Sequence, residues 1–118
     1  MKNQSFSRRL TFALMGIRSA WRSEASFKTQ VVAAAAVIAA LLWLRPAPLW
    51  WAIAAVTIAF VLAAELFNTA IEGLADHLHP ELAPAIKVVK DCAAGAVLVA
   101  SVAAIGVAAA FLFELLLR

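Results

Sequence analysis

The chain alternates between long apolar stretches and short polar ones. Residues 31–44, 46–64 and 92–113 carry no charged side chain. A helix needs about 20 mainly apolar residues to cross a membrane. The second and third stretches are long enough, and the first becomes so if its helix begins near residue 24. The pattern therefore predicts transmembrane helices at about residues 24–44, 49–78 and 86–116.

A different periodicity precedes these stretches, over residues 5–22. Apolar side chains recur there at helical spacing, with arginines between them. Such a pattern is typical of an amphipathic helix that lies in the membrane interface. The apolar positions are Phe6, Leu10, Ala13, Leu14, Ile17 and Trp21.

These elements predict an all-α integral membrane protein, with an N-terminal amphipathic surface helix and three transmembrane helices in a single domain over residues 1–118. Composition supports this class, because 65% of the residues are apolar and 14% are charged. A soluble domain has roughly 45–50% apolar and 25% charged residues. A soluble domain this small could not bury so much apolar surface.

Charge distribution predicts the orientation in the membrane. Residues 1–30 carry six of the ten Lys and Arg residues, and Lys87 and Lys90 lie on the same side of the predicted membrane. Arg45 and Arg118 lie on the other side. The positive-inside rule then favours an N-terminus on the cytoplasmic side and a C-terminus outside. The net charge of +3 is too small, and too concentrated at one end, to indicate a nucleic-acid partner.

The second apolar stretch continues into an acidic one. Glu65, Asn68, Glu72 and Asp76 are spaced at 0, 3, 7 and 11 residues, which places them within a stripe about 80° wide on a helix. Three carboxylates on one face repel each other, and each costs roughly 2.5–3.5 kcal/mol at membrane depth. Cations must therefore neutralise this stripe.

Further charges lie at the inner ends of the other two spans. Glu24 precedes the first span, and Lys90 and Asp91 precede the third. We expect five acidic residues to gather with Lys90 at one membrane level: Glu24, Glu65, Glu72, Asp76 and Asp91.

Clustered carboxylates without histidine or cysteine ligands suit a hard cation such as Mg²⁺. A neighbouring lysine can neutralise a phosphoryl group during transfer, and a further carboxylate can act as base toward an alcohol. This chemistry favours phosphoryl transfer at the membrane surface. The same spacing also fits a non-catalytic membrane scaffold or a small proton-coupled transporter.

Two blocks of sequence decide between these alternatives. The segment 65–76, ELFNTAIEGLAD, is followed by Lys90-Asp91 and then by AAGAV at residues 93–97. Near the start, RSAW at residues 18–21 precedes EASF at residues 24–27. Together they resemble the prokaryotic diacylglycerol kinase family, which includes the undecaprenol kinases of Gram-positive bacteria.

The resemblance implies a homotrimer of the bacterial cytoplasmic (inner) membrane that transfers the γ-phosphate of ATP to the hydroxyl of a membrane lipid, with Mg²⁺. It implies Glu65 as catalytic base, with Asn68 and Lys90 also in the catalytic site, and Glu24 and Glu72 as metal ligands. For the nucleotide site it implies Glu24, Glu72, Asp76, Glu81, Lys90 and Asp91. For the lipid site it implies Arg18, Trp21, Phe27, Trp43 and Glu65.

The chain departs from the family pattern at two positions. Ala94 stands where some diacylglycerol kinases have serine, which removes any hydroxyl contact there, and Phe12 stands where some members have tyrosine, which removes a polar nucleotide contact from the surface helix. The loop at residues 77–81 and the run at residues 93–97 lean toward the undecaprenol kinase branch. We expect diacylglycerol to be converted to phosphatidic acid, with undecaprenol as the alternative acceptor.

Overall fold

The computed structural model describes residues 3–81 and 83–117 of the chain. Lys2 and Arg118, which contribute to the charge count above, lie outside these residues. The described chain forms four helices: α1 (Phe6–Ser23), α2 (Ala25–Leu44), α3 (Pro48–Leu78) and α4 (Pro84–Leu117). Each helix begins and ends within two residues of the range predicted from the sequence, and the all-α membrane fold class is confirmed.

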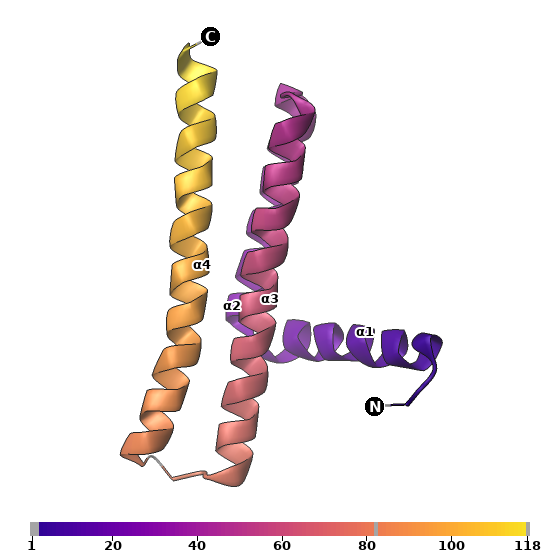
Figure 1. Cartoon of the computed structure of the whole chain (residues 1–118), viewed down its shortest axis with the longest axis vertical. Coiled ribbons are helices and arrows are strands. Elements are labelled where there is room, and N and C mark those ends of the chain that lie inside the picture. The colour runs from indigo at the N-terminus through magenta and orange to yellow at the C-terminus, as the bar shows by residue number, and fades with distance from the viewer. Residues whose placement is uncertain (1–2, 82, 118) are drawn as a thin grey trace.

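The helix α1 lies crosswise to the other three (Figure 1). Its first turn is capped by Ser5, whose hydroxyl oxygen accepts a hydrogen bond from the Arg8 backbone N–H at 3.4 Å. Such caps satisfy one of the backbone donors left free at a helix start. The helix ends at Ser23. Glu24 follows as a single extended residue, with φ −117° and ψ 109°, and α2 begins at Ala25.

The turn between α2 and α3 is also short, with three residues, 45–47. Arg45 adopts the left-handed conformation, with φ 50° and ψ 58°, and its N–H bonds to the carbonyl of Leu41 at 2.8 Å. The residue before a proline is disfavoured in the right-handed helical region, which explains why α2 stops before Pro46. Pro48 then occupies the first turn of α3, where the missing N–H costs no hydrogen bond.

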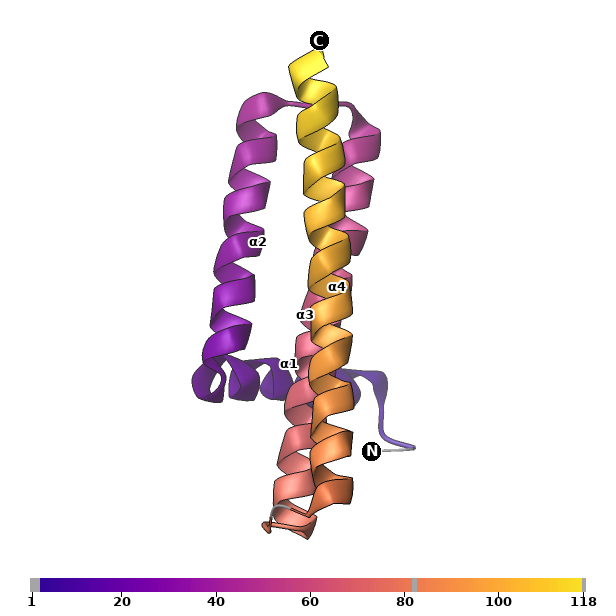
Figure 2. The ribbon, with the colours of Figure 1, turned by 90° about the vertical axis from the view of Figure 1, so that its left-hand side faces the viewer.

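The three long helices are apolar and long enough to cross a membrane. Their closest packing is between α3 and α4, which run antiparallel and side by side, while α2 lies against α3 (Figure 2). Small residues dominate the buried positions on α4, Ala93 and Ala100. Most large apolar side chains face outward instead, because hydrocarbon solvates them as well as a protein interior does.

The helices differ in length, and the excess lies at one end. At about 1.5 Å per residue, α2 spans about 30 Å whereas α3 spans about 46 Å. Since α2 ends where α3 starts, the last third of α3 and the first part of α4 extend beyond the level of α1 (Figures 1 and 2). This end of the bundle carries the acidic stripe.

Ala100 provides a test of the α3–α4 packing. It is 2% exposed, and the neighbour of α4 is α3. We expect Ala100→Leu to destabilise the protein by about 1–3 kcal/mol, because an isobutyl side chain in place of the methyl must push the two helices apart. Unfolding in detergent micelles, followed by circular dichroism, would measure the change.

Ala109→Leu is the matched control, since Ala109 is exposed on the opposite face of α4. An Ala100→Leu variant as stable as Ala109→Leu would contradict the packing described.

Candidate active site

The acidic stripe begins at a buried carboxylate. Glu65 is 2% exposed, the one buried charged side chain in the described part of the chain. Its two carboxylate oxygens each lie 2.7 Å from the Oγ of Ser26, on the first turn of α2. The Ser26 hydroxyl therefore donates to this carboxylate across the α2–α3 interface. The sequence analysis did not identify Ser26, because one serine at the start of a helix has no periodicity that marks it.

After Glu65, the remaining residues of the stripe lie progressively further along α3, beyond the level of α1. Asn68, Glu72 and Asp76 follow at 3, 7 and 11 residues, so Asp76 lies about 16 Å further along the axis of α3. Glu72 is half-buried and Asp76 is exposed. The expectation that these acidic residues share one membrane level is wrong: each residue adds a fixed rise along the helix, and α3 continues past the surface helix.

Two ion pairs lie at the end of α3 and α4 that extends beyond α1. The Lys90 Nζ on α4 contacts the Asp76 carboxylate on α3, so the predicted neutralisation of the stripe by Lys90 is seen at its outermost member. Lys87 pairs with Asp91 at 2.6 Å within α4. Consecutive residues of a helix point about 100° apart, which separates Asp91 from Lys90.

Glu24 occupies the corner between α1 and α2 and is half-buried. It precedes Ser26, whose hydroxyl contacts Glu65, by two residues. Within residues 3–81 and 83–117, no three acidic, histidine or cysteine side chains are grouped so that they could share a metal ion.

One buried oxygen without a hydrogen-bond partner among the described residues lies between Glu65 and Glu72 in the stripe. It is the Oδ1 atom of Asn68. Buried polar atoms are seldom left unpaired. The atom lies about one helical turn from both Glu65 and Glu72, so its free acceptor adds an amide oxygen to their carboxylate oxygens on the same face of α3.

An apolar cavity of about 430 Å³ lies against the segment of α3 that contains Glu65, although Glu65 itself does not line it. Its walls combine α1, α2 and α3, and Leu62 and Leu66 flank Glu65 in sequence. Three of the residues predicted for the lipid site, Arg18, Trp21 and Phe27, line this cavity. The Lys28 ammonium lies 5.9 Å from the centre of the Trp21 ring, within the range of a cation–π interaction.

Two other predicted residues lie apart from this cavity. Trp43 is 84% exposed and sits near the far end of α2, about 24 Å from Phe27 along the helix. Glu81 is exposed in the loop between α3 and α4. The single chain therefore does not bring Trp43 to the other lipid-site residues.

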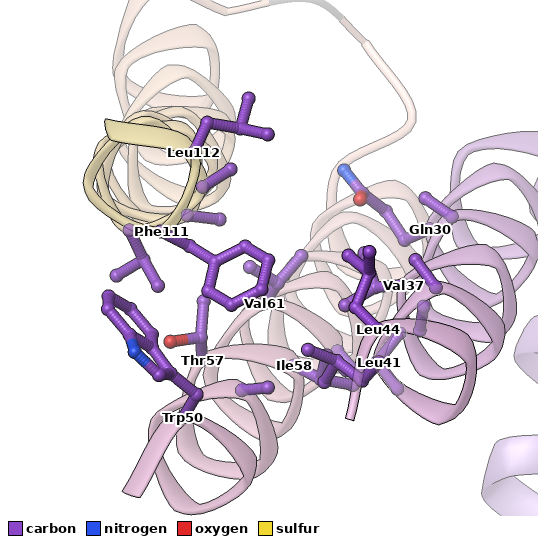
Figure 3. A pocket seen from close by; sticks show the side chains of 18 residues that line it. Gln30, Val37, Leu41, Leu44, Trp50, Thr57, Ile58, Val61, Phe111 and Leu112 are labelled. Atoms are coloured by element: carbon purple, nitrogen blue, oxygen red, sulfur yellow. The ribbon is translucent and has the colours of Figure 1, made fainter. Parts of the chain in front are cut away.

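A second cavity, of about 330 Å³, opens between α2, α3 and α4 toward the opposite end of the bundle (Figure 3). Its labelled walls are apolar apart from Gln30, Thr57 and the ring nitrogen of Trp50. None of the residues that line it is charged. This groove is suited to contact with acyl chains or helices rather than to phosphoryl chemistry.

The family description "Prokaryotic diacylglycerol kinase" matches residues 11–112, which cover α2 and α3 in full and most of α1 and α4. The chain belongs to the prokaryotic diacylglycerol kinase family. A curated relative, the "Diacylglycerol kinase" of Synechocystis sp., is 36% identical over 110 residues.

The alignment with that relative covers 90% of this chain and 61% of the relative. The chain thus spans about three fifths of the length of the curated diacylglycerol kinase it matches. Membership of the family agrees with the three membrane-spanning helices and with a bacterial membrane protein.

The geometry of Lys90 predicts a small role in stability. The side chain of Lys90 is 29% exposed and that of Asp76 is 61% exposed, and exposed ion pairs contribute about 0–1 kcal/mol. We expect Lys90→Ala to lower the free energy of unfolding by less than about 1 kcal/mol. Lys87→Ala, which breaks the exposed pair within α4, is the control. A loss above about 2 kcal/mol at Lys90 alone would show that this pair is structural.

Proposed function

We propose that this protein is an ATP- and Mg²⁺-dependent lipid kinase of the inner membrane that phosphorylates the hydroxyl of a membrane lipid, with diacylglycerol as the acceptor. The observation that carries the proposal is the buried Glu65 carboxylate, which already accepts a hydrogen bond from the Ser26 hydroxyl, on a segment of α3 whose Leu62 and Leu66 line an apolar cavity. The family and the name of the Synechocystis relative support the reaction class.

The acceptor lipid would enter through the apolar cavity. Trp21 and Phe27 offer apolar walls for the acyl chains, and Arg18 offers a cation at the level of polar lipid groups. The lipid hydroxyl would donate its hydrogen bond to Glu65, in the manner that the Ser26 hydroxyl does. A carboxylate within hydrogen-bond reach of an alcohol is placed to act as general base.

The phosphoryl donor would bind further out, along the part of α3 and α4 that extends beyond α1. As the lipid oxygen bonds to the γ-phosphorus, its proton passes to Glu65, and the bond from that phosphorus to the bridging oxygen of ATP breaks to release ADP. Lys90 would offset the negative charge of the phosphates, with Asp76, Asp91 and Glu81 bordering the nucleotide.

The residues present fit Mg²⁺. Glu24, Glu72 and the unpaired Oδ1 of Asn68 offer only oxygen donors, which Mg²⁺ prefers. Protein sites usually hold this ion by one or two carboxylates together with substrate phosphates, so a cluster of three acidic residues is not required. When bound, the ion would neutralise charge on the transferred phosphoryl group.

We further propose a homotrimer with the N-terminus cytoplasmic and the C-terminus outside. The open apolar groove of Figure 3 supports self-association, because alanine-rich helix surfaces allow close approach of another helix. The basic side chains of α1 support the orientation, since they favour the anionic cytoplasmic leaflet. Trp43, remote from the cavity of its own chain, would reach a lipid site only in an assembly.

The role of Glu65 can be tested directly. We expect Glu65→Gln to lower the rate of lipid phosphorylation by at least about 100-fold, because an amide cannot accept the alcohol proton. Transfer of radiolabelled γ-phosphate to lipid in mixed micelles would measure it. Glu114→Gln, which changes a carboxylate at the opposite end of the bundle, should retain the wild-type rate. A Glu65→Gln variant within about threefold of wild type would contradict the assignment.

The acceptor can be tested with the unmodified protein. We expect phosphatidic acid from diacylglycerol and ATP, with the product lost when Mg²⁺ is removed by a chelator. Undecaprenol, assayed under the same conditions, is the competing acceptor. Faster phosphorylation of undecaprenol would move the protein to the other branch of the family, and absence of both products would overturn the kinase function.

A further inference from the structure

The contact between Ser26 and Glu65 is unusual among the hydroxyl groups of this chain. Thr29, Thr57 and Thr69 each donate to the backbone carbonyl four residues earlier in their own helix. Hydroxyl side chains within helices commonly make this bond. Ser26 instead donates to a side chain 39 residues away on another helix.

The corner at Glu24 explains the difference. The carbonyl four residues before Ser26 belongs to Arg22, which lies in α1, and the extended conformation of Glu24 turns the chain between them. The usual acceptor is therefore not aligned with α2. Three residues later the helix is established, and Thr29 finds the carbonyl of Ala25 at 3.1 Å. The position of Ser26 leaves its hydroxyl available to α3.

The geometry of the contact constrains the carboxylate. Ser26 Oγ lies 2.7 Å from both oxygens of Glu65, so it faces the open side of the carboxylate rather than one end. A glutamate side chain has several rotatable bonds, and this contact fixes the position of its terminus. A carboxylate offers about four acceptor sites, so one serine proton leaves others for a second donor.

The surroundings favour a role in orientation. Glu65 is 2% exposed, and hydrogen bonds in such surroundings are electrostatically stronger than in water. Leu62 and Leu66, which flank it on α3, line the apolar cavity together with Phe27, the residue after Ser26. The hydroxyl thus contacts the carboxylate on the segment of α3 whose neighbouring residues line the cavity.

We propose that Ser26 is a positioning residue for Glu65: its hydroxyl holds the carboxylate in the orientation that receives the proton of the acceptor lipid. This inference rests on the proposed kinase function. It assigns a role in the reaction to a residue of α2 that contacts neither a phosphate nor the lipid, and acts through Glu65.

The test compares four proteins in the same mixed-micelle assay: wild type, Ser26→Ala, Ser26→Thr and Thr29→Val. We expect Ser26→Ala to lower kcat about 10- to 100-fold, with KM for lipid and for ATP within about twofold, because misplacement of a catalytic group slows the chemical step. Ser26→Thr restores a hydroxyl and should recover most of kcat. Thr29→Val, which removes a hydroxyl bonded only to the backbone, should match wild type.

A double variant separates positioning from general damage. If Ser26 acts through Glu65, adding Ser26→Ala to Glu65→Gln should cause little further loss, since coupled residues are not additive. The inference is overturned if Ser26→Ala keeps the wild-type kcat or changes only KM. It is also overturned if threonine fails to restore kcat, or if the loss adds in full to that of Glu65→Gln. A wild-type protein without lipid kinase activity would instead overturn the proposed function.

Discussion

The thickness of the hydrocarbon layer, about 30 Å, governs how this bundle is arranged. The helix α2 matches that thickness, and the three-residue turn after it fixes the start of α3 at the same level. At that end Trp50 on α3 donates to Glu114 on α4 at 2.6 Å and packs edge-on against Phe111. With one end aligned in this way, the additional length of α3 and α4 can emerge only at the other. Residues 68–78 therefore leave the layer into which α2 fits.

This alignment sorts the polar side chains by their distance from the hydrocarbon. Glu65 lies at the level of the first turn of α2, where it is buried and bonded by Ser26. Glu72 is half-buried and Asp76, further out, is exposed and paired with Lys90. A charged group is costly in hydrocarbon and tolerated at its edge. The carboxylates of α3 accordingly become more exposed with their distance from the hydrocarbon layer. In the proposed reaction this order would suit the two substrates, because an acceptor lipid and a soluble nucleotide would approach from opposite sides.

Much of the fold could be predicted from the sequence, because each helix is specified by its own residues. The uncharged stretches, the amphipathic spacing of residues 5–22 and the prolines after Leu44 gave helix limits close to those observed. The acidic stripe was also visible, since it lies on one helix. The partnership of Ser26 with Glu65 depends on how α2 packs on α3, which no single-helix pattern contains. The shared level of the acidic residues was wrong for a different reason, since the rise along a single helix already separates Glu65 from Asp76, as it separates Trp43 from Phe27.

The corner at Glu24 has a mechanical consequence. One residue joins the end of α1 to the start of α2, and a linker of one residue contains no slack. Rocking of the surface helix must be absorbed by the two backbone torsions of Glu24 or passed to the first turn of α2. That turn carries Ser26, and through its hydroxyl the movement reaches Glu65. A change in the tilt of α1 on the lipid headgroups is in this way transmitted to the buried carboxylate of Glu65.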